Sequence, residues 1–300
     1  MRFLVFGSLN IDHVYEMPHL VREGETVAAR GHKALAGGKG LNQAIALSRA
    51  GASVHFAGAV GEDGAFLKRM LEDGGVDAQN VRTLACPSGH AVIQVDECGR
   101  NAIIIYGGAN REITPEMIDE TLFSYGEGDW LLMQNEISCG EYLLKRAAER
   151  GLRVVLNPSP ISRDMLSWPI EQADMLIFNE IEGCELTGRT EPDEILDALL
   201  ARCPKSRLVL TLGENGAICA DGERRLRQSA FPVKAVDTTA AGDTFTGYFL
   251  AAIAQEVSPA EAMKPACAAA AIAVSRPGAT PSIPMAEEVK RMLEQGGLVS

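Results

Sequence analysis

The most informative stretch of the chain reads Val236-Asp237-Thr238-Thr239-Ala240-Ala241-Gly242-Asp243-Thr244-Phe245-Thr246-Gly247. Small residues lead into a predicted helix over 242–255, in which Phe245, Phe249 and Ile253 recur at i, i+4 and i+8. The first N–H groups of a helix lack partners within it, and the positive end of the dipole lies there, so such a start favours an anion. Alanine and glycine leave room for a phosphate.

The acid in this stretch, Asp243, stands at the rim of the predicted anion site. A carboxylate does not help to bind phosphate, but it is well suited to orient a hydroxyl that attacks phosphorus. The alternative is an ordinary acid in the first helical turn, where the dipole stabilises it by about 0.3–1 kcal/mol.

The rest of the chain alternates between short apolar runs and helix-like segments, which is typical of a parallel sheet covered by helices on both faces. The predicted strands are 3–7, 54–60, 130–134, 153–156, 175–178 and 208–212, and the predicted helices are 40–50, 65–72, 140–150, 194–201, 242–255 and 260–275. Gly51 and Gly151 follow two of these helices as C-terminal caps. We expect an α/β fold with a central, mostly parallel sheet, formed by residues 1–300 as a single domain.

Two segments interrupt the alternation. Residues 91–96 and 101–106 alternate like hairpin strands around a turn that contains Gly99, and residues 13–35 show no helical pattern. We therefore expect a small antiparallel β-sheet lid over the main sheet, formed by about 13–35 and 90–108.

Composition excludes several classes of function. The 300 residues are 46% hydrophobic and carry a net charge of −12, so there is no basic stripe for nucleic acid or an anionic membrane. The longest apolar run, 266–274, is about half a membrane span, and the start of the chain shows no signal-peptide core. Seven scattered cysteines and five histidines form no zinc spacing and no disulfide framework. A cytoplasmic protein that binds neither nucleic acid nor membrane is expected.

Polar residues follow the predicted strands, where open parallel sheets bind their ligands. They include Asn10, Asp12, 134–136, Asn157, 179–182 and Gly213. In an extended segment, Asn10 and Asp12 share a face and could bond two neighbouring hydroxyls of a polyol. Turn and helix-cap roles are the alternative for each residue taken singly.

A second glycine-rich motif, 36–43, opens the first predicted helix with Gly37, Gly38 and Gly40 around Lys39. Glycine allows the backbone to approach a ligand closely. The motif is not a Walker A loop, because Lys33 stands where that motif requires its first glycine. A purely structural loop before a helix is the alternative.

In combination, these motifs resemble the PfkB carbohydrate-kinase family, and within it the members that phosphorylate ribose. The resemblance covers nearly the whole chain, and the matching segments in chain order are 7–12, 37–44, 108–110, 157–158, 179–182, 211–216 and 237–245. It implies the fold of that family and an ATP-dependent transfer of phosphate to an alcohol, the 5-hydroxyl of D-ribose.

The resemblance also implies roles for individual residues. Asp243 is the implied base, next to an anion hole of Ala240, Ala241 and Gly242 amides. The implied sugar site comprises Asn10, Asp12, Gly38, Lys39, Asn42, Glu136 and Asp243. The implied ATP site comprises Asn179, Thr211, Gly213, Gly216, Gly242 and Cys267. Glu182 is implied to help position Mg²⁺ through water, and a monovalent cation, usually K⁺, is implied at Asp237, Thr239, Ala273, Arg276, Gly278 and Ser282.

One departure from the family pattern concerns the purine site, since Cys267 replaces a histidine or asparagine that is common there. The related alternatives are a kinase for deoxyribose, fructose or another sugar, or for a nucleoside, and less favoured is a sugar-binding regulator without catalysis. A nucleoside kinase should offer an aromatic wall near the lid, for which only Tyr15 and Tyr106 are candidates. The family also implies a possible homodimer through the lid.

Overall fold

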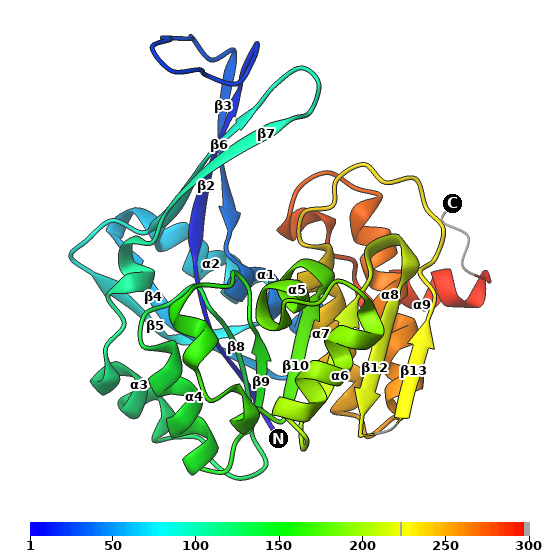
Figure 1. The fold of residues 1–300 in the computed structure, drawn as a ribbon. Helices are drawn as coiled ribbons and strands as arrows, with labels where there is room; N and C mark the ends of the chain where they lie inside the picture. Colours follow the sequence, from blue (N-terminus) through cyan, green and yellow to red (C-terminus); the bar gives the residue numbers. More distant parts are fainter. Residues whose placement is uncertain (223, 297–300) are drawn as a thin grey trace.

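A computed structural model of the chain describes residues 1–222 and 224–296. Its main sheet has nine strands in the order β13-β12-β11-β10-β9-β8-β1-β4-β5, and all neighbours are parallel except at β12 and β13 (Figure 1). The strands are β1 (Phe3–Phe6), β4 (Val54–Gly61), β5 (Asp77–Leu84), β8 (Trp130–Gln134), β9 (Arg153–Asn157), β10 (Met175–Asn179), β11 (Arg207–Thr211), β12 (Ala217–Asp221) and β13 (Arg224–Gln228). The predicted, mostly parallel sheet is confirmed.

Helices cover both faces of this sheet. They are α1 (Lys39–Arg49), α2 (Ala65–Asp73), α3 (Pro115–Leu122), α4 (Gly140–Glu149), α5 (Glu180–Thr187), α6 (Pro192–Arg202), α7 (Ala241–Ile253), α8 (Pro259–Val274) and α9 (Ala286–Glu294). The two-residue period of β1 divides the core, because Phe3 and Val5 pack with α1, α7 and α8, whereas Leu4 and Phe6 pack with α3, α4 and α6. Continuous apolar runs are therefore strands buried on both faces.

Four strands form the lid, which projects from the body of the molecule in Figure 1. They are β2 (Asn10–Glu16), β3 (Gly31–Gly37), β6 (Gly89–Val95) and β7 (Asn101–Tyr106), in the order β3-β2-β6-β7. The predicted hairpin β6–β7 is antiparallel, with Gly99 at φ +76° in its turn. The central pair, β2–β6, is parallel, so the lid is a mixed sheet and the expectation of a purely antiparallel one is wrong. The two strands come from hairpins that are separate in the chain and enter the lid in the same direction.

Several elements lie outside the predicted set: α3, α5, α9, β5, β12 and β13. The edge strands β5 and β13 read Asp-Ala-Gln-Asn-Val-Arg-Thr-Leu and Arg-Arg-Leu-Arg-Gln, too polar to register as buried strands. Edge strands tolerate this composition because one side meets solvent. Gly51 and Gly151, with φ of +93° and +76°, follow α1 and α4 as predicted. Within the described residues, no helix has the length and apolar character needed to cross a bilayer.

Candidate active site

The order of the strands fixes where a ligand site can form. The chain leaves β1 for β4 and β5 on one side and later returns to β8 on the other side of β1. Loops diverge at such a reversal and leave a crevice beyond the carboxyl ends of the two strands. A short hydrogen bond from the Ser8 hydroxyl, after β1, to the Glu136 carboxylate, after β8, links the two loops at this crevice. The Lys39 backbone N–H donates to the same Glu136 oxygen at 3.0 Å.

The glycines of the 36–43 motif serve this crevice through packing. A Cβ on Gly40 would lie 2.5 Å from the Ser8 backbone nitrogen, and one on Gly37 would lie 2.1 Å from the Asp12 carboxylate. Gly38 has φ +98°, a conformation that L side chains rarely adopt. The predicted close approach is present, and at Gly37 and Gly40 it brings parts of the chain itself together, which fits the structural alternative for this motif.

Charge is concentrated at the base of the lid. Burial raises the pKa of Asp12 to about 6, and the neighbouring Glu136 carboxylate adds to the effect. Burial lowers the pKa of the Lys39 ammonium, but the carboxylates of Asp243, Glu136 and Glu182 outweigh it, so the net shift is upward. Lys39 is therefore held as a cation among the carboxylates of Asp243, Glu136 and Glu182.

The amide of Asn10 has a defined orientation. The Leu9 backbone N–H donates to Asn110 Oδ1 at 3.1 Å, which makes the other amide atom of Asn110 its nitrogen. Asn110 Nδ2 then donates to Asn10 Oδ1 at 2.8 Å. Because its oxygen is occupied, Asn10 offers its NH₂ group to a ligand, next to the acceptor Asp12 on the same face of β2. The predicted shared face of Asn10 and Asp12 is present, on a lid strand that is separate from β1.

Asp243 lies in the first turn of α7 and is buried. Asn42 Nδ2 donates to its Oδ2 at 3.1 Å, and Gln43 Nε2 donates to its Oδ1 at 2.9 Å. Thr280 Oγ1 donates in turn to Asn42 Oδ1 at 3.0 Å, so both ends of the Asn42 amide are occupied. Asn42, expected to contact sugar, holds the acid in this structure.

The residues before Asp243 form a sharp turn. Ala240 caps α7 with φ +59° and ψ +10°, a left-handed conformation. The Ala241 N–H donates a long hydrogen bond of 3.3 Å to the Thr238 carbonyl. A Cβ on Gly242 would meet nothing within 4 Å among the described residues. This helix start is open, as the sequence predicts.

A polar cavity of about 180 Å³ opens over this turn. Its lining comes mainly from the start of α1, from the carboxyl ends of β9, β10 and β11, and from the start of α7. It includes Lys39, Asn157, Asn179, Glu182, Thr211, Ala240, Ala241, Gly242 and Asp243. Asn179 caps α5 and accepts from the Glu182 N–H at 2.9 Å, while the Asn179 N–H donates to Glu182 Oε2 at 2.9 Å. The two residues thus form a capping box and line the cavity at the same time.

A larger and more apolar cavity, of about 790 Å³, adjoins the polar one at Gly242. Both cavities are lined by Thr211, Thr238, Ala241 and Gly242. The larger one also contains the predicted nucleotide residues Gly213, Gly216 and Cys267, together with Phe231, Phe245 and Val274. Burial raises the pKa of the Cys267 thiol to about 12, so it lines the cavity as a neutral, apolar group.

The predicted monovalent-cation residues lie on two loops that the structure brings together. Asp237 accepts from the Gly278 N–H at 2.9 Å and from the Thr239 N–H at 2.9 Å. Burial raises the Asp237 pKa, but these bonds and that of the Thr239 hydroxyl lower it by more, so the carboxylate stays charged. Ser282 is buried and donates to the Ala279 carbonyl at 2.7 Å, and the Ala273 carbonyl accepts from the Arg276 N–H.

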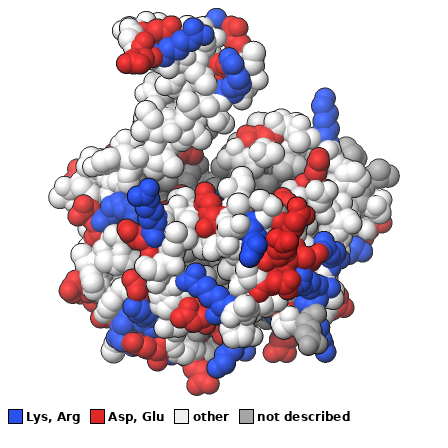
Figure 2. All heavy atoms as spheres, viewed as in Figure 1, with Lys and Arg blue, Asp and Glu red and all other residues white. Residues whose placement is uncertain are grey.

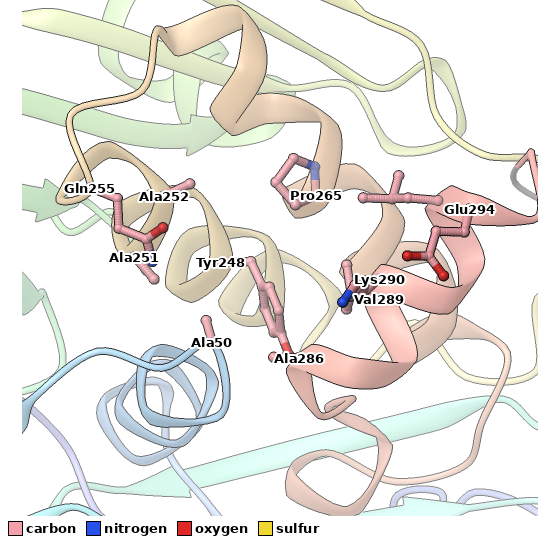
Figure 3. A pocket seen from close by; sticks show the side chains of 11 residues that line it. Ala50, Tyr248, Ala251, Ala252, Gln255, Pro265, Ala286, Val289, Lys290 and Glu294 are labelled. Atoms are coloured by element: carbon pink, nitrogen blue, oxygen red, sulfur yellow. The ribbon is translucent and has the colours of Figure 1, made fainter.

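Two further observations delimit the site. Among residues 1–222 and 224–296, no three His, Cys, Asp or Glu side chains gather as metal ligands. A third hollow, of about 390 Å³ between α7, α8 and α9, is lined by Tyr248, Pro265 and Val289 and holds none of the predicted site residues (Figure 3). The sequence prediction missed Gln43 and Thr280 as contacts of the site, although Gln43 stands beside Asn42 in the glycine motif.

Comparisons with known proteins agree with this geometry. The profile of the pfkB family carbohydrate kinases matches residues 2–286. Ribokinase of Haemophilus influenzae is 36% identical, over 97% of both chains, and a deoxyribokinase of Salmonella typhi is 32% identical over 98% of this chain and 99% of its own. A structure of Arabidopsis thaliana ribokinase complexed with ribose and ATP superposes with a TM-score of 0.84 at 33% identity, covering 98% of both chains. The chain belongs to the pfkB family of carbohydrate kinases.

Proposed function

We propose that the protein is an ATP-dependent kinase that transfers the γ-phosphoryl group of ATP to the 5-hydroxyl of D-ribose. One observation carries the proposal: a buried carboxylate, Asp243, lies at the start of α7 and lines a polar cavity, which shares Thr211, Thr238, Ala241 and Gly242 with a larger, more apolar one. A sugar bound at the base of the lid and a nucleotide in the larger cavity would bring the acceptor hydroxyl and the phosphate together at the polar cavity, where Asp243 lies. Full-length relatives that are named ribokinases support the assignment.

In the proposed reaction, the sugar hydroxyl oxygen attacks the γ-phosphorus, the bond from that phosphorus to the β,γ-bridging oxygen breaks, and ADP leaves. The hydroxyl proton passes to Asp243 as the new P–O bond forms. Asn42 and Gln43 hold the two carboxylate oxygens, so the base is oriented before substrate arrives. The amides of Ala240, Ala241 and Gly242 would stabilise charge on the transferred group.

The sugar is proposed to lie at the base of the lid. Asn10 supplies N–H donors and Asp12 an acceptor, which suits two neighbouring hydroxyls of a furanose. Lys39, Glu136, Gly38 and Asn42 complete the proposed site. On the nucleotide side, we propose that Asn179, Thr211, Gly213 and Gly216 contact the phosphates and ribose of ATP, and that Cys267 lies near the base.

Two metal ions belong to the proposal. Mg²⁺ would neutralise charge on the triphosphate, held largely through water near Glu182. One buried carboxylate, with no acidic cluster beside it among the described residues, fits a metal that keeps most of its waters. A monovalent cation, K⁺, would lie between the loops of Asp237 and Gly278. The charged Asp237 and the carbonyls nearby are the hard oxygen donors such an ion requires, and binding would fix the turn before Asp243.

Related substrates are the main alternative. The deoxyribokinase relative shows that identity at this level does not separate ribose from deoxyribose. A nucleoside is less favoured, because Tyr15 packs on His32 and Tyr106 on His90. The strand register places all four rings on the face of the lid opposite Asn10 and Asp12. A regulator without catalysis would have no use for a braced base at Asp243.

The lid is proposed to act within the single domain 1–300 and to pair two subunits. All six residues of the edge strand β7 are exposed, including Ile103, Ile104 and Ile105 at 52–65%. Figure 2 shows an uncharged stem below a charged lid tip. An apolar edge strand of this kind is a surface for association.

The cytoplasm is the proposed location, because seven scattered cysteines suit a reducing compartment.

The test is coupled ADP release with ATP and a panel of ribose, 2-deoxyribose, fructose and nucleosides, in K⁺ and then in Na⁺. We expect ribose to give the highest kcat/KM and K⁺ to exceed Na⁺. Asp243→Asn should still bind ribose while its kcat falls about 100- to 10,000-fold. ADP release that is independent of sugar, or an unimpaired Asp243→Asn enzyme, contradicts the proposed function.

A further inference from the structure

A chain of buried amides leads away from Asp243 to the centre of the main sheet. Gln43, Gln134 and Asn157 are 1%, 0% and 8% exposed, so each amide must find its partners within the protein. They come from α1, β8 and β9, three elements that meet at the carboxyl ends of the strands. Neither Gln134 nor Asn157 donates a hydrogen bond to Asp243, so any effect of these two residues on the carboxylate must pass through Gln43.

Backbone atoms fix which way these amides point. The Ile177 carbonyl can only accept, so the atom of Asn157 that faces it at 2.8 Å is Nδ2, and its other amide atom is Oδ1. Gln43 Nε2 donates to that Oδ1 at 3.1 Å and to Asp243 Oδ1 at 2.9 Å. Both N–H groups of Gln43 are therefore committed, one to the sheet and one to the base.

The remaining end of Gln43 is held by Gln134. Gln134 Nε2 donates to Gln43 Oε1 at 2.6 Å. Gln134 Oε1 has no hydrogen-bond partner among the described residues, and it lies against Gly7, where a Cβ would come within 2.3 Å of it. An unpaired buried oxygen costs stability. Gln134 therefore loses a bond at one end while it anchors Gln43 at the other.

We propose that Gln134 and Asn157 are positioning residues for phosphoryl transfer, which act through Gln43 to hold the Asp243 carboxylate in line with the acceptor hydroxyl. The inference rests on the proposed function. Three hydrogen bonds hold the Gln43 amide, to Asn157, Gln134 and Asp243, so they link the Asp243 carboxylate on α7 to strands β8 and β9 of the main sheet. Small displacements of a reacting group cost about 100-fold in rate, which is the scale of effect expected here.

Gln134→Met tests the anchor without a net increase in the number of unpaired polar atoms. The substitution removes the unpaired Gln134 Oε1 and leaves Gln43 Oε1 unpaired in its place, so the melting temperature should change little. We expect kcat to fall about 10- to 100-fold, with KM for ribose and for ATP unchanged within about threefold. The exposed Gln172→Met is the matched control and should keep the wild-type kcat.

Gln134→Glu gives a signature that altered packing alone would not produce. In its protonated form the introduced carboxyl can donate to Gln43 Oε1 and replace the bond from Gln134 Nε2. In its ionised form it can only accept, so it competes with Asp243 for the NH₂ group of Gln43. The ratio of the kcat of Gln134→Glu to the wild-type kcat should be close to one at acidic pH and should fall about 10- to 100-fold as pH rises. A flat ratio, or a wild-type kcat in Gln134→Met, overturns the inference while the proposed function stands.

A crystal structure of Gln134→Met separates the two ideas. If the wild-type protein releases no ADP with any sugar, the proposed function fails, and the positioning role of Gln134 is then judged from the variant structure alone. A Gln43 amide that turns or shifts away from Asp243, with a rotated carboxylate, supports the relay. Gln43 and Asp243 unmoved in the variant overturn it.

Discussion

Asp12 is a carboxylate whose burial at the base of the lid should destabilise the protein in the absence of substrate. Its pKa is raised from 3.8 to about 6 by burial and by Glu136. Between these values the folded protein binds a proton that the unfolded chain releases, so stability falls as pH rises from about 4 to 6. One pKa unit corresponds to about 1.4 kcal/mol, so above pH 6 the cost is about 3 kcal/mol.

Asp12→Asn removes this cost while it keeps the shape of the side chain. We expect the variant to be more stable than wild type by up to about 3 kcal/mol at pH 7.5 and by much less near pH 4. Urea denaturation at the two pH values measures the difference. The same substitution should raise KM for ribose, because the neutral amide that replaces the carboxylate is a weaker acceptor for the sugar hydroxyls.

Asp96→Asn is the matched control on the same lid. Asp96 accepts from Arg100 and from the Cys98 and Arg100 N–H groups, and these bonds together lower its pKa despite an opposing effect of burial. Its removal should therefore destabilise the protein at pH 7.5, the sign opposite to Asp12→Asn. An Asp12→Asn variant that is less stable than wild type, or a gain that does not grow with pH, would refute the reasoning.

Three further predictions follow from local packing. Gly40→Ala should lower the free energy of unfolding by about 1–3 kcal/mol through its clash with Ser8, whereas Gly242→Ala, with open space around it, should leave thermal stability unchanged and raise KM for ATP. Cys267→Leu should reduce the larger cavity and raise KM for ATP with KM for ribose unchanged, in steady-state assays of both substrates. Ile104→Asp should shift a lid-mediated dimer to monomer in sedimentation velocity, and a monomeric wild type would exclude that dimer.

The sequence predicts the interior of this fold well because both faces of its central strands are buried. Trp130–Gln134 is a continuous apolar run closed by a polar residue, and the structure assigns the same bounds to β8. The hairpin pattern predicts the lid but not the parallel pairing of β2 with β6, because no local pattern encodes the direction in which two distant segments meet.

The candidate site is predicted as a set of residues more readily than as a set of contacts. Asp243, Asn42 and Lys39 do lie together, as the motifs indicate. However, the spacing of a motif does not show which way an amide points: the resemblance implies Asn42 at the sugar, and the structure adds that its amide is bonded to Asp243 and Thr280. Long-range hydrogen bonds decide that orientation, and they exist only after the chain has folded.

The contact between α1 and α7 explains how two motifs about 200 residues apart make one site. A Cβ on Gly247 would lie 2.4 Å from the Ala46 Cβ and 2.6 Å from the Leu47 nitrogen, so glycine allows the two helices to touch there. Gly247 lies four residues after Asp243, and residues 46 and 47 lie four after Asn42 and Gln43. Residues at i and i+4 share a helix face, so a close approach one turn below the site brings both amides to the acid. The glycine that ends the motif thus sets the distance at which its acid is held.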